Sequence, residues 1–558
     1  MEENAMVRRI RQSIIGDGRP LAGPYGTRRL VYADHTASGR AVGFVETFIR
    51  DQVLPWYANT HNDSSATAAQ TNALREDARR VIRDAVGGDE DTVVIFSGSG
   101  ATGAISKLID ILGLRVPAVL QDRHRLTDAI PVRDRPVVFI GPFEHHSNEL
   151  LWRESICEVV TIPEDASGQP SHSALREELA RHADRSVKIG AFSAASNVTG
   201  IVADTHRISD LLHQHGALAL WDFAAAAPHG AVRMHDECDD HPLSYKDAVF
   251  ISPHKFLGGP GTPGVLVVRR ELLGNRVPSV PGGGTVDYVS PTEQHYIADA
   301  AHREEGGTPA IVESIRAGLA FGLQQAVGAA VIHEREQAFL RRALDSWSTD
   351  PNLEILGNLD ADRLAIVSLM MTGPGGKRLH HNYVVTLLSD LFGIQVRGGC
   401  SCAGPYGHRL LGIDPDLSRR FEREILAGRE GIKPGWVRVS FNYAMSDTVV
   451  DYVIEAVHQV ATWGWKLLGD YRFDPLTGLW RHHRATGPRV RLADMRYDVN
   501  RPRRADQVGE DALAGHLGDA ARVFAGADRP DDRRPARVSG DFDDLRWFDL
   551  PEVCLSTA

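Results

Sequence analysis

The sequence is short of cysteine and of long apolar runs. Five cysteines in 558 residues are too few and too scattered for a disulfide framework, and no pair of Cys-x-x-Cys motifs indicates a zinc site. Every apolar stretch is broken by charge well short of a membrane span, and Met1–Gly18 lacks the apolar core of a signal peptide. These absences predict a cytoplasmic protein with no bound metal and no membrane partner.

Positive charge is also in deficit. The 62 Lys and Arg residues are outnumbered by 73 Asp and Glu, which gives a formal net charge of -11. Because binding to nucleic acid needs clustered positive charge, we expect no nucleic-acid partner, and an acidic membrane surface is disfavoured for the same reason. With 42% hydrophobic and 24% charged residues, the chain is typical of a globular protein of roughly two to four domains.

What the sequence does contain, from Thr92 onward, is a series of short apolar runs that alternate with amphipathic stretches. Buried strands alternating with helices predict an α/β domain built on a mostly parallel sheet, whose ligands bind beyond the carboxyl ends of the strands. The residues just after each run are therefore the candidates for a site. The expected strands are Val93–Phe96, Val137–Ile140, Val159–Ile162, Ile189–Phe192, Ala217–Trp221, Val249–Ile251 and Val265–Val268.

A glycine-rich loop, Ser97–Gly103, follows the first run and opens a helical pattern. Its glycines match Gly-x-Gly-x-x-Gly, and Asp122 lies at about the spacing of a ribose-binding acid, so a nicotinamide oxidoreductase is one alternative. The free N–H groups at the start of any helix favour an anion, however. The loop predicts a phosphate site and leaves open which ligand carries the phosphate.

Polar side chains follow other runs. Asp222 ends one run, and a buried acid needs a positive partner. Lys255 follows another; a lysine at the end of a buried strand loses hydration, its ammonium is disfavoured, and it can then form a Schiff base. The neighbours His145 and His146 could ligate a metal, but no third ligand is evident, and an imidazole stacked on a flat cofactor fits equally well.

One ligand accounts for the whole set of candidates, and that ligand is pyridoxal 5′-phosphate. Its phosphate matches the loop at Gly100, Ala101 and Thr102, and its ring would lie under His145. The remaining polar groups of the cofactor are a phenolic oxygen, a protonated ring nitrogen and an aldehyde, and they match Asn197, Asp222 and Lys255 respectively.

A set of short motifs keeps a fixed order between Val31 and Leu468: Tyr32–Ser38, Ser97–Ile105, Glu144–Asn148, Ser196–Gly200, Asp222, Ser252–Gly261, Gly306–Pro309, Arg397–Pro405 and Val437–Ser440. In these motifs the chain resembles the class V aminotransferase-fold enzymes, and among them the branch of cysteine desulfurases and selenocysteine lyases. The resemblance implies a fold type I pyridoxal-phosphate-dependent transferase: a large, mostly parallel seven-stranded domain, a smaller α+β domain, and a homodimer.

The domain ranges that follow are 1–60 as an N-terminal segment contributing to the small domain, 61–340 as the cofactor-binding domain, 341–468 as the small domain with a cysteine loop, and 469–558 as an extension of unknown role. Within the extension, Tyr471–Trp480 predicts a hairpin, Arg501–Asp541 has the composition of a linker, and Leu545–Leu550 is apolar enough to dock on the body of the protein.

The resemblance also implies roles for individual residues. Lys255 holds the cofactor and later moves the substrate's Cα proton, and Asp222 keeps the ring nitrogen protonated. The phosphate ligands are Gly100, Ala101, Thr102, Ser252, His254 and Thr308 of the partner subunit. The substrate ligands are Arg438, which grips the α-carboxylate, together with Arg397 and Asn197; His145 stacks on the ring and counts among the catalytic groups.

Cys402 occupies the position of the family's nucleophile, and Arg397 nearby favours its thiolate. The implied reaction removes sulfur from L-cysteine or a related amino acid, leaves a persulfide on Cys402, releases alanine and calls for a sulfur-acceptor protein. Two departures from the family pattern are Ala225, where glutamine is usual, and Cys400, where histidine is common; Cys400 is either a second sulfur acceptor or simply a small residue.

The alternatives in chemistry are a class V aminotransferase, an epimerase or a β-eliminating C–S lyase, which share the cofactor and form no persulfide. Outside this chemistry, the sequence leaves open an NAD(P)-binding oxidoreductase that uses Gly98–Gly103 and a non-catalytic scaffold that keeps only the fold.

Overall fold

The computed structural model describes residues 4–60, 63–235, 240–485, 487, 490–495, 507–527 and 540–550. The chain forms two compact units. Unit 1 comprises Met1–Ile15, His35–Glu336 and Asp360–Leu364, and unit 2 comprises Gly16–Asp34, Gln337–Leu359 and Ala365–Ala558. The segment 1–60 is thus divided, with only Gly16–Asp34 belonging to unit 2.

Unit 1 is built on a seven-stranded sheet with the strand order β4-β10-β9-β8-β7-β5-β6. Neighbouring strands are parallel from β9 through β6, and β10 alone runs antiparallel to both of its neighbours. Each strand coincides with one of the predicted apolar runs, so the mostly parallel seven-stranded sheet is confirmed. The strands are β4 (Thr92–Ser97), β5 (Val137–Ile140), β6 (Glu158–Thr161), β7 (Lys188–Ser193), β8 (Leu218–Asp222), β9 (Ala248–Ile251) and β10 (Gly264–Arg269).

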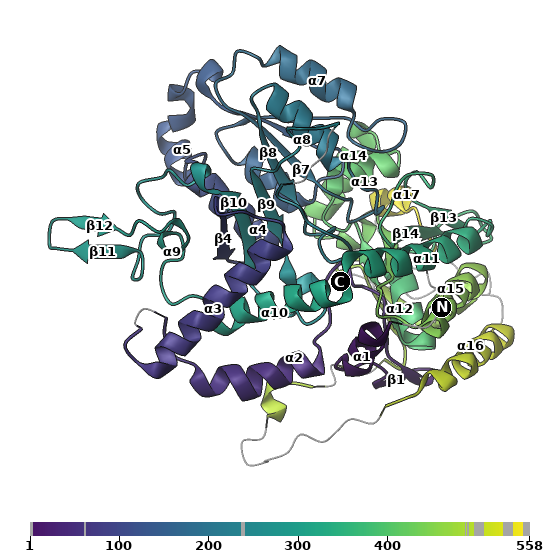
Figure 1. Cartoon of the computed structure of the whole chain (residues 1–558). Helices are drawn as coiled ribbons and strands as arrows, with labels where there is room; N and C mark the ends of the chain where they lie inside the picture. Colours follow the sequence, from purple (N-terminus) through teal and green to yellow (C-terminus); the bar gives the residue numbers. More distant parts are fainter. Residues whose placement is uncertain are drawn as a thin grey trace. The chain divides into compact units, whose positions relative to one another are not determined.

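The helices of unit 1 cover the sheet, and most strand residues are buried as a result. The long helices α3 and α10 pack so closely that a Cβ on Gly318 would lie 2.7 Å from Ala78 Cα. A hairpin of β11 (Val286–Val289) and β12 (Gln294–Tyr296) projects from this unit (Figure 1). The helices are α1 (Ala5–Ser13), α2 (Gly43–Phe48), α3 (Ala66–Ala85), α4 (Gly100–Ile111), α5 (Ala118–His124), α6 (Leu150–Arg153), α7 (His172–Arg181), α8 (Thr205–Gln214), α9 (Ala300–Arg303) and α10 (Ile311–Val327), while α11 (Ala329–Trp347) continues from unit 1 into unit 2.

The strand register brings the candidate side chains to one edge of this sheet. Asp222 at the end of β8 pairs with Ser193 at the end of β7 and with Phe250 of β9. Because β10 runs in the opposite direction, its first residue, Gly264, pairs with Ser97 at the end of β4. The loops after β4, β7, β8 and β9 therefore meet beyond the same edge.

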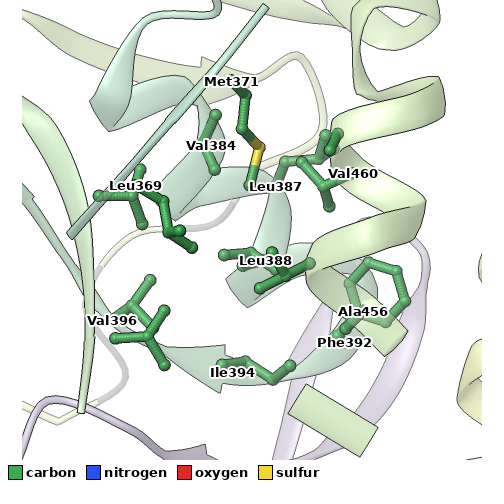
Figure 2. Close-up of a cluster of buried hydrophobic side chains, with 14 of the residues drawn as sticks. Leu369, Met371, Val384, Leu387, Leu388, Phe392, Ile394, Val396, Ala456 and Val460 are labelled. Atoms are coloured by element: carbon green, nitrogen blue, oxygen red, sulfur yellow. The ribbon is translucent and has the colours of Figure 1, made fainter. Parts of the chain in front are cut away.

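Unit 2 contains a four-stranded antiparallel sheet in the order β13-β14-β17-β16. Side chains from β14, from the segment Ile394–Val396 and from helices α12 and α15 form its core, including Leu369, Leu388 and Val460 (Figure 2). The elements are β1 (Pro20–Gly23), β2 (Gly26–Arg29), β3 (Val31–Tyr32), β13 (Leu353–Ile355), β14 (Ile366–Met371), α12 (His381–Phe392), β15 (Ile394–Gln395), β16 (Arg397–Gly399), α13 (Gly404–Leu410), α14 (Pro415–Leu426), β17 (Trp436–Ser440), α15 (Asp447–Trp463), β18 (Tyr471–Asp474), β19 (Leu479–His482), α16 (Leu513–Gly526) and α17 (Gly540–Leu545).

The C-terminal extension is part of unit 2. The predicted hairpin is confirmed as β18 and β19. The linker prediction is wrong over residues 507–527, because Leu513, Ala520 and Phe524 lie on one face of α16 and are buried there. Its last two residues, 540 and 541, begin α17, and residues 501–506 and 528–539 lie outside the described residues. Docking of the last segment is confirmed by Phe548, which is fully buried against the ring of His380.

None of the described helices is by itself long and apolar enough to cross a membrane. Helices α10 and α11 meet the criteria of length and composition only as a pair, and this pair is bent by 76° at its junction.

Candidate functional site

The phosphate-binding motif of unit 1 lies at the start of α4. The backbone N–H of Ala101 donates to Ser252 Oγ at 2.9 Å. Gly100 has a φ of +58°, and a Cβ at this position would lie 2.8 Å from both Ser252 Oγ and His254 Cε1. Only glycine allows this close approach, so the loop after β4 and the loop after β9 are brought together at a helix N-terminus, where the free N–H groups favour an anion.

Thr102 and His145 extend this cluster. Thr102 Oγ1 lies 2.6 Å from Ser147 Oγ, and the backbone N–H of Ser147 donates to His145 Nδ1 at 3.1 Å. Burial, and then the charge of Lys255, lowers the pKa of His254 to about 4. His254 is therefore a neutral hydrogen-bonding group at neutral pH, and the positive potential that an anion meets here comes from the helix N-terminus and Lys255.

Asp222 and Lys255 are close enough to interact electrostatically. Asp222 is only 4% exposed at the end of β8, and its Oδ1 accepts a hydrogen bond from the Ala224 N–H at 2.8 Å. Burial raises the pKa of Asp222, and the Ala224 N–H and the positive charge of Lys255 act in the opposite direction. Lys255 ends a short helical turn, Pro253–Lys255, directly after β9. A buried carboxylate thus lies within electrostatic range of a half-buried amine.

Glu144 is a residue of this site that the sequence analysis did not single out. Its fully buried carboxylate accepts hydrogen bonds from the Gly141 N–H, the Ser193 N–H and hydroxyl, and Asn148 Nδ2, at 2.6–3.0 Å. Burial raises its pKa to about 7. Glu144 ties the loop that carries His145 to the end of β7. The signal was a charged residue in the short loop after an apolar run, four positions beyond Ile140 and inside a recognised motif.

The alternatives of a metal site and a dinucleotide site lose their support. Within the described residues, no group of three or more His, Cys, Asp or Glu side chains is placed to hold a metal ion. Asp122 is exposed on α5 instead of lying at the end of a strand, where a ribose-binding acid belongs.

Asn197 and Ala225 are buried in the loops that follow β7 and β8. Asn197 lies in a turn fixed by the Ser196 hydroxyl, which accepts from the backbone N–H groups of Val198 and Thr199 at 3.1 Å. Thr308 is exposed, and its hydroxyl accepts a hydrogen bond from Asn59 Nδ2 at 3.2 Å. All of the cofactor ligands predicted from the sequence therefore belong to unit 1.

The predicted substrate arginines belong to unit 2, where they share a carboxylate that the sequence analysis missed. Asp34 Oδ1 accepts from Arg438 Nη2 at 3.0 Å, and Asp34 Oδ2 accepts from Arg397 Nε at 3.1 Å. Arg438 is 3% exposed, and burial lowers its pKa despite the opposing charge of Asp34. Asp34 holds two positive groups with one negative charge, which leaves a net positive site suited to a carboxylate.

Cys402 lies in unit 2 on a tight turn between β16 and α13. Cys400 and Cys402 are both exposed free thiols. Ser401 and Cys402 have φ values of +54° and +56°, and the Trp436 Nε1–H donates to Ser401 Oγ at 3.2 Å. Such left-handed backbone is strained for residues other than glycine, and strain of this kind concentrates at functional sites.

Comparison with known proteins identifies the family to which the chain is similar. The family model Aminotransferase class-V matches residues 31–453. A probable cysteine desulfurase from Staphylococcus aureus (strain Mu50 / ATCC 700699) is 28% identical over 382 residues, which are 68% of this chain and 84% of that protein. A probable cysteine desulfurase from Staphylococcus epidermidis (strain ATCC 12228 / FDA PCI 1200) is 27% identical over 400 residues, 71% of this chain and 88% of that protein.

Solved structures show the same fold. The apo cysteine desulfurase from Thermococcus onnurineus NA1 superimposes with a TM-score of 0.62 at 22% identity, covering 77% of this chain and 94% of that one. The cysteine desulfurase CsdA from Escherichia coli gives a TM-score of 0.59 at 23% identity, covering 81% of this chain and 97% of that one. At this identity the likeness establishes the fold, which is that of the predicted fold type I transferases.

Proposed function

The chain belongs to the class-V aminotransferase family, and from this premise we propose that it is a cysteine desulfurase-like enzyme that acts on L-cysteine or a close relative. The family depends on pyridoxal 5′-phosphate, and so does this enzyme. The observation that carries the proposal is the presence, in one chain, of the cofactor motif around Lys255 and of an exposed Cys402 thiol on a strained turn.

The residues of unit 1 fit the cofactor. The N-terminus of α4, the Ser252 hydroxyl and the Thr102 hydroxyl supply donors for a phosphate, and the neutral ring of His254 is one more hydrogen-bonding group for its oxygens. Asp222 is a buried carboxylate at the edge of the sheet, which a protonated ring nitrogen would neutralise. Lys255 supplies the amine that an aldehyde needs.

When bound, the cofactor supplies an electron sink for the negative charge that develops at the substrate's Cα. Lys255 Nζ is the amine that would hold the cofactor's aldehyde group, and the freed amine would then take and return the proton at the substrate's Cα. Asp222 would keep a proton on the ring nitrogen, and the His145 imidazole would hold the face of the ring. Asn197 would donate to the phenolic oxygen, because Ala225 offers no side-chain donor there.

Arg438 and Arg397 bind the substrate's α-carboxylate, and Asp34 fixes the direction of both guanidinium groups. The Cys402 thiolate attacks Sγ of the bound cysteine. A bond forms between the two sulfur atoms, the Cβ–Sγ bond of the substrate breaks, and the bonding electrons pass to the substrate carbon skeleton, which is protonated and leaves as alanine. Cys402 is left as a persulfide, which a sulfur-acceptor protein or a small thiol then discharges.

Elimination of the β-substituent is the competing reaction, because it needs the same cofactor and no thiol. The test is to give the cofactor-loaded protein L-cysteine with a reductant and to quantify alanine and pyruvate. We expect alanine, and we expect Lys255→Ala to abolish both its formation and the visible absorbance band of the lysine-bound cofactor, near about 420 nm. Pyruvate as the main product would assign the chain to the β-eliminating lyases instead.

We also propose a homodimer in which Thr308 of each subunit binds the cofactor phosphate of its partner. The exposed Thr308 hydroxyl contacts Asn59, and Trp56 and Tyr57 nearby in the chain are 46% and 51% exposed. Large exposed aromatic side chains next to a functional residue favour an interface. Light scattering of the purified protein tests the oligomeric state; a cytoplasmic location stays a prediction from composition.

A further inference from the structure

The turn that carries Cys402 carries a second exposed thiol, that of Cys400. The N–H of Ala403 donates to the Cys400 carbonyl at 3.1 Å, which closes a four-residue turn over Ser401 and Cys402. Both of these central residues have positive φ. A β-turn with positive φ at both central positions is of type I′, which strongly prefers Asn-Gly there.

A structural role does not account for this choice of residues. Left-handed backbone is strained for a residue with a Cβ, and glycine at position 402 would avoid that strain. Cysteine is among the residue types most often buried, yet both side chains are exposed and contribute little packing. The Trp436 indole holds the turn through Ser401 and leaves the two cysteine side chains at the surface. The reactivity of the thiols is therefore the feature that explains their presence.

Metal binding and disulfide formation are the two common uses of a pair of thiols, and neither fits this turn. Within the part of the chain that the structure describes, no third His, Cys, Asp or Glu joins them in a metal-binding group. A Cys-x-Cys disulfide would close a very small and strained ring. What remains is exchange of sulfur between the thiols. Two residue steps place their Cα atoms at most about 7 Å apart, so each thiol lies within reach of a sulfur atom bound to the other.

We infer that Cys400 is a second sulfur carrier, which accepts the outer sulfur of the persulfide formed on Cys402. This inference rests on the proposed desulfurase function. The Cys400 thiolate attacks the outer sulfur of Cys402–S–SH, a bond forms between Cys400 Sγ and that sulfur, and the bond from Cys402 Sγ to it breaks. Cys402 leaves as a thiolate, and the proton stays on the transferred sulfur. The exchange is neutral in redox terms and needs no further reactant.

The exchange restores the Cys402 thiolate before any acceptor has arrived. Cys402 can then attack a second substrate molecule, so one subunit stores two sulfur atoms on one turn. A chain that has Cys402 but lacks the Cys400 thiol stops after one turnover when no acceptor or reductant is present.

The test is a burst experiment on the cofactor-loaded enzyme with excess L-cysteine and with neither reductant nor acceptor. We expect the wild type to release about two equivalents of alanine per subunit, Cys400→Ser about one, and Cys402→Ser none. Cys157→Ser, a change at a half-buried thiol of unit 1, is the matched control and should behave as the wild type. Tandem mass spectrometry of the peptide spanning the turn should locate extra sulfur on both cysteines in the wild type and on Cys402 alone in Cys400→Ser.

The outcomes separate the relay from the function on which it rests. One equivalent of alanine in both the wild type and Cys400→Ser, with sulfur on Cys402 only, would overturn the relay and leave the desulfurase proposal standing. No alanine from the cofactor-loaded wild type, or pyruvate in its place, would overturn both.

Discussion

Asp34 is the residue that connects the two arginines proposed to bind substrate. Its carboxylate contacts Arg438 through one oxygen and Arg397 through the other. The backbone supports this arrangement, because the N–H of Ser440 donates to the carbonyl of Ala33 at 2.9 Å, one residue before Asp34. A guanidinium held on one side by a carboxylate presents its other N–H groups in a fixed direction.

Replacing Asp34 by asparagine keeps the side chain's size and removes its charge. We expect Asp34→Asn to raise the KM for the amino acid roughly tenfold, with a smaller effect on kcat, because the arginines lose their fixed direction. Asp17→Asn, which removes an ion pair with Arg29 elsewhere in unit 2, is the matched control and should leave KM unchanged. Steady-state kinetics measure both; a loss in kcat at constant KM would contradict the positioning role.

At the residue scale, the sequence predicted which side chains form the site better than it predicted which residues those side chains contact. Lys255, Asp222, Ser252 and the loop at Gly100 could be predicted because each lies at or within a few residues of the carboxyl end of a buried strand, and parallel strands end at one edge. Asp34 could not, because its partner Arg438 is 404 positions away and only the folded chain brings them together.

The segment that leads to Thr308 is an element fixed by buried charge. The side chain of Glu305 is 4% exposed and contacts Arg75 and Arg79 of α3, and it also accepts from the Phe96 N–H of β4 at 2.7 Å. Burial alone raises the pKa of Glu305, but the two arginines outweigh burial and hold the pKa at about 2. The ion pairs thus join α3, β4 and the Gly306–Pro309 motif.

Removing this charge takes a buried counter-ion from both Arg75 and Arg79, and leaves Arg79 paired only with the more exposed Glu76 among these carboxylates. We expect Glu305→Gln to lower the free energy of unfolding by about 3–5 kcal/mol, because breaking a buried ion pair costs far more than breaking an exposed one. Asp77→Asn is the control on the same helix: its pair with Arg80 is exposed, and the change should stay within about 0.5 kcal/mol. Denaturant titration measures the free energy of unfolding of both variants. Equal losses in the two variants would contradict a stabilising role for the buried ion pairs of Glu305.

Helix α9 carries a titratable cap. Asp299 accepts from the backbone N–H of His302 and lies 2.7 Å from its ring, and Glu76 lies 3.2 Å from the other ring nitrogen. These two carboxylates raise the pKa of His302 to about 9, above its usual value of 6.5. Because the folded protein binds this proton more tightly, the stabilisation is fully present below pH 6.5 and is lost as the pH rises through about 9.

We therefore expect His302→Ala to lower the melting temperature more at pH 6 than at pH 10, a comparison that brackets the titration. His295→Ala, on the exposed strand β12, provides the control and should show no such difference. Melting curves at both pH values measure the effect. A fall in melting temperature of the same size at both pH values would show that the charge of His302 does not contribute to stability.

At the scale of elements, strands were easier to predict than the C-terminal helices. The seven strands of unit 1 are short, apolar and bounded by turn residues, a pattern typical of buried strands in a parallel sheet. Helix α16 was missed because the Arg, Asp and Pro residues around it dominate the composition, whereas its apolar residues occupy a single face.

For the whole molecule, the C-terminal extension is a part of unit 2 that completes its core. Phe548 is fully buried, and its ring centroid lies 4.5 Å from that of His380 and 5.3 Å from that of Phe473. Trp547 stacks on both His380 and His381, and its Nε1–H donates to the Ile432 carbonyl at 3.1 Å. Burial lowers the pKa of both histidines, so this aromatic cluster is uncharged.

Phe548→Ala removes a large side chain from this cluster. We expect the free energy of unfolding to fall by about 3–5 kcal/mol, as for other buried phenylalanines. Hydrogen exchange should rise in α12 and in the β18–β19 hairpin, with little change in α4 of unit 1. Leu476→Ala, at a side chain 45% exposed, is the control. Unchanged exchange in α12 would mean that the extension does not support unit 2.

The sequence predicted that the N-terminal segment contributes to the small domain, but not which of its residues do so. Residues 16–34 belong to unit 2 because β3 pairs in parallel with β15, more than 360 positions later, and such long-range pairing leaves no local pattern. The alternation of apolar runs with helical patterns did predict the α/β class, and the motifs predicted the family, since the chemistry of the cofactor constrains residue types wherever the chain places them.

The central claim is that Cys402 takes sulfur from L-cysteine, and the ratio of products tests it most directly. The cofactor-loaded enzyme should convert L-cysteine, in the presence of a reductant, to alanine and sulfide in equal amounts, and Cys402→Ala should lose both while keeping the cofactor's visible absorbance. Alanine and sulfide formed at an undiminished rate by Cys402→Ala would contradict the account.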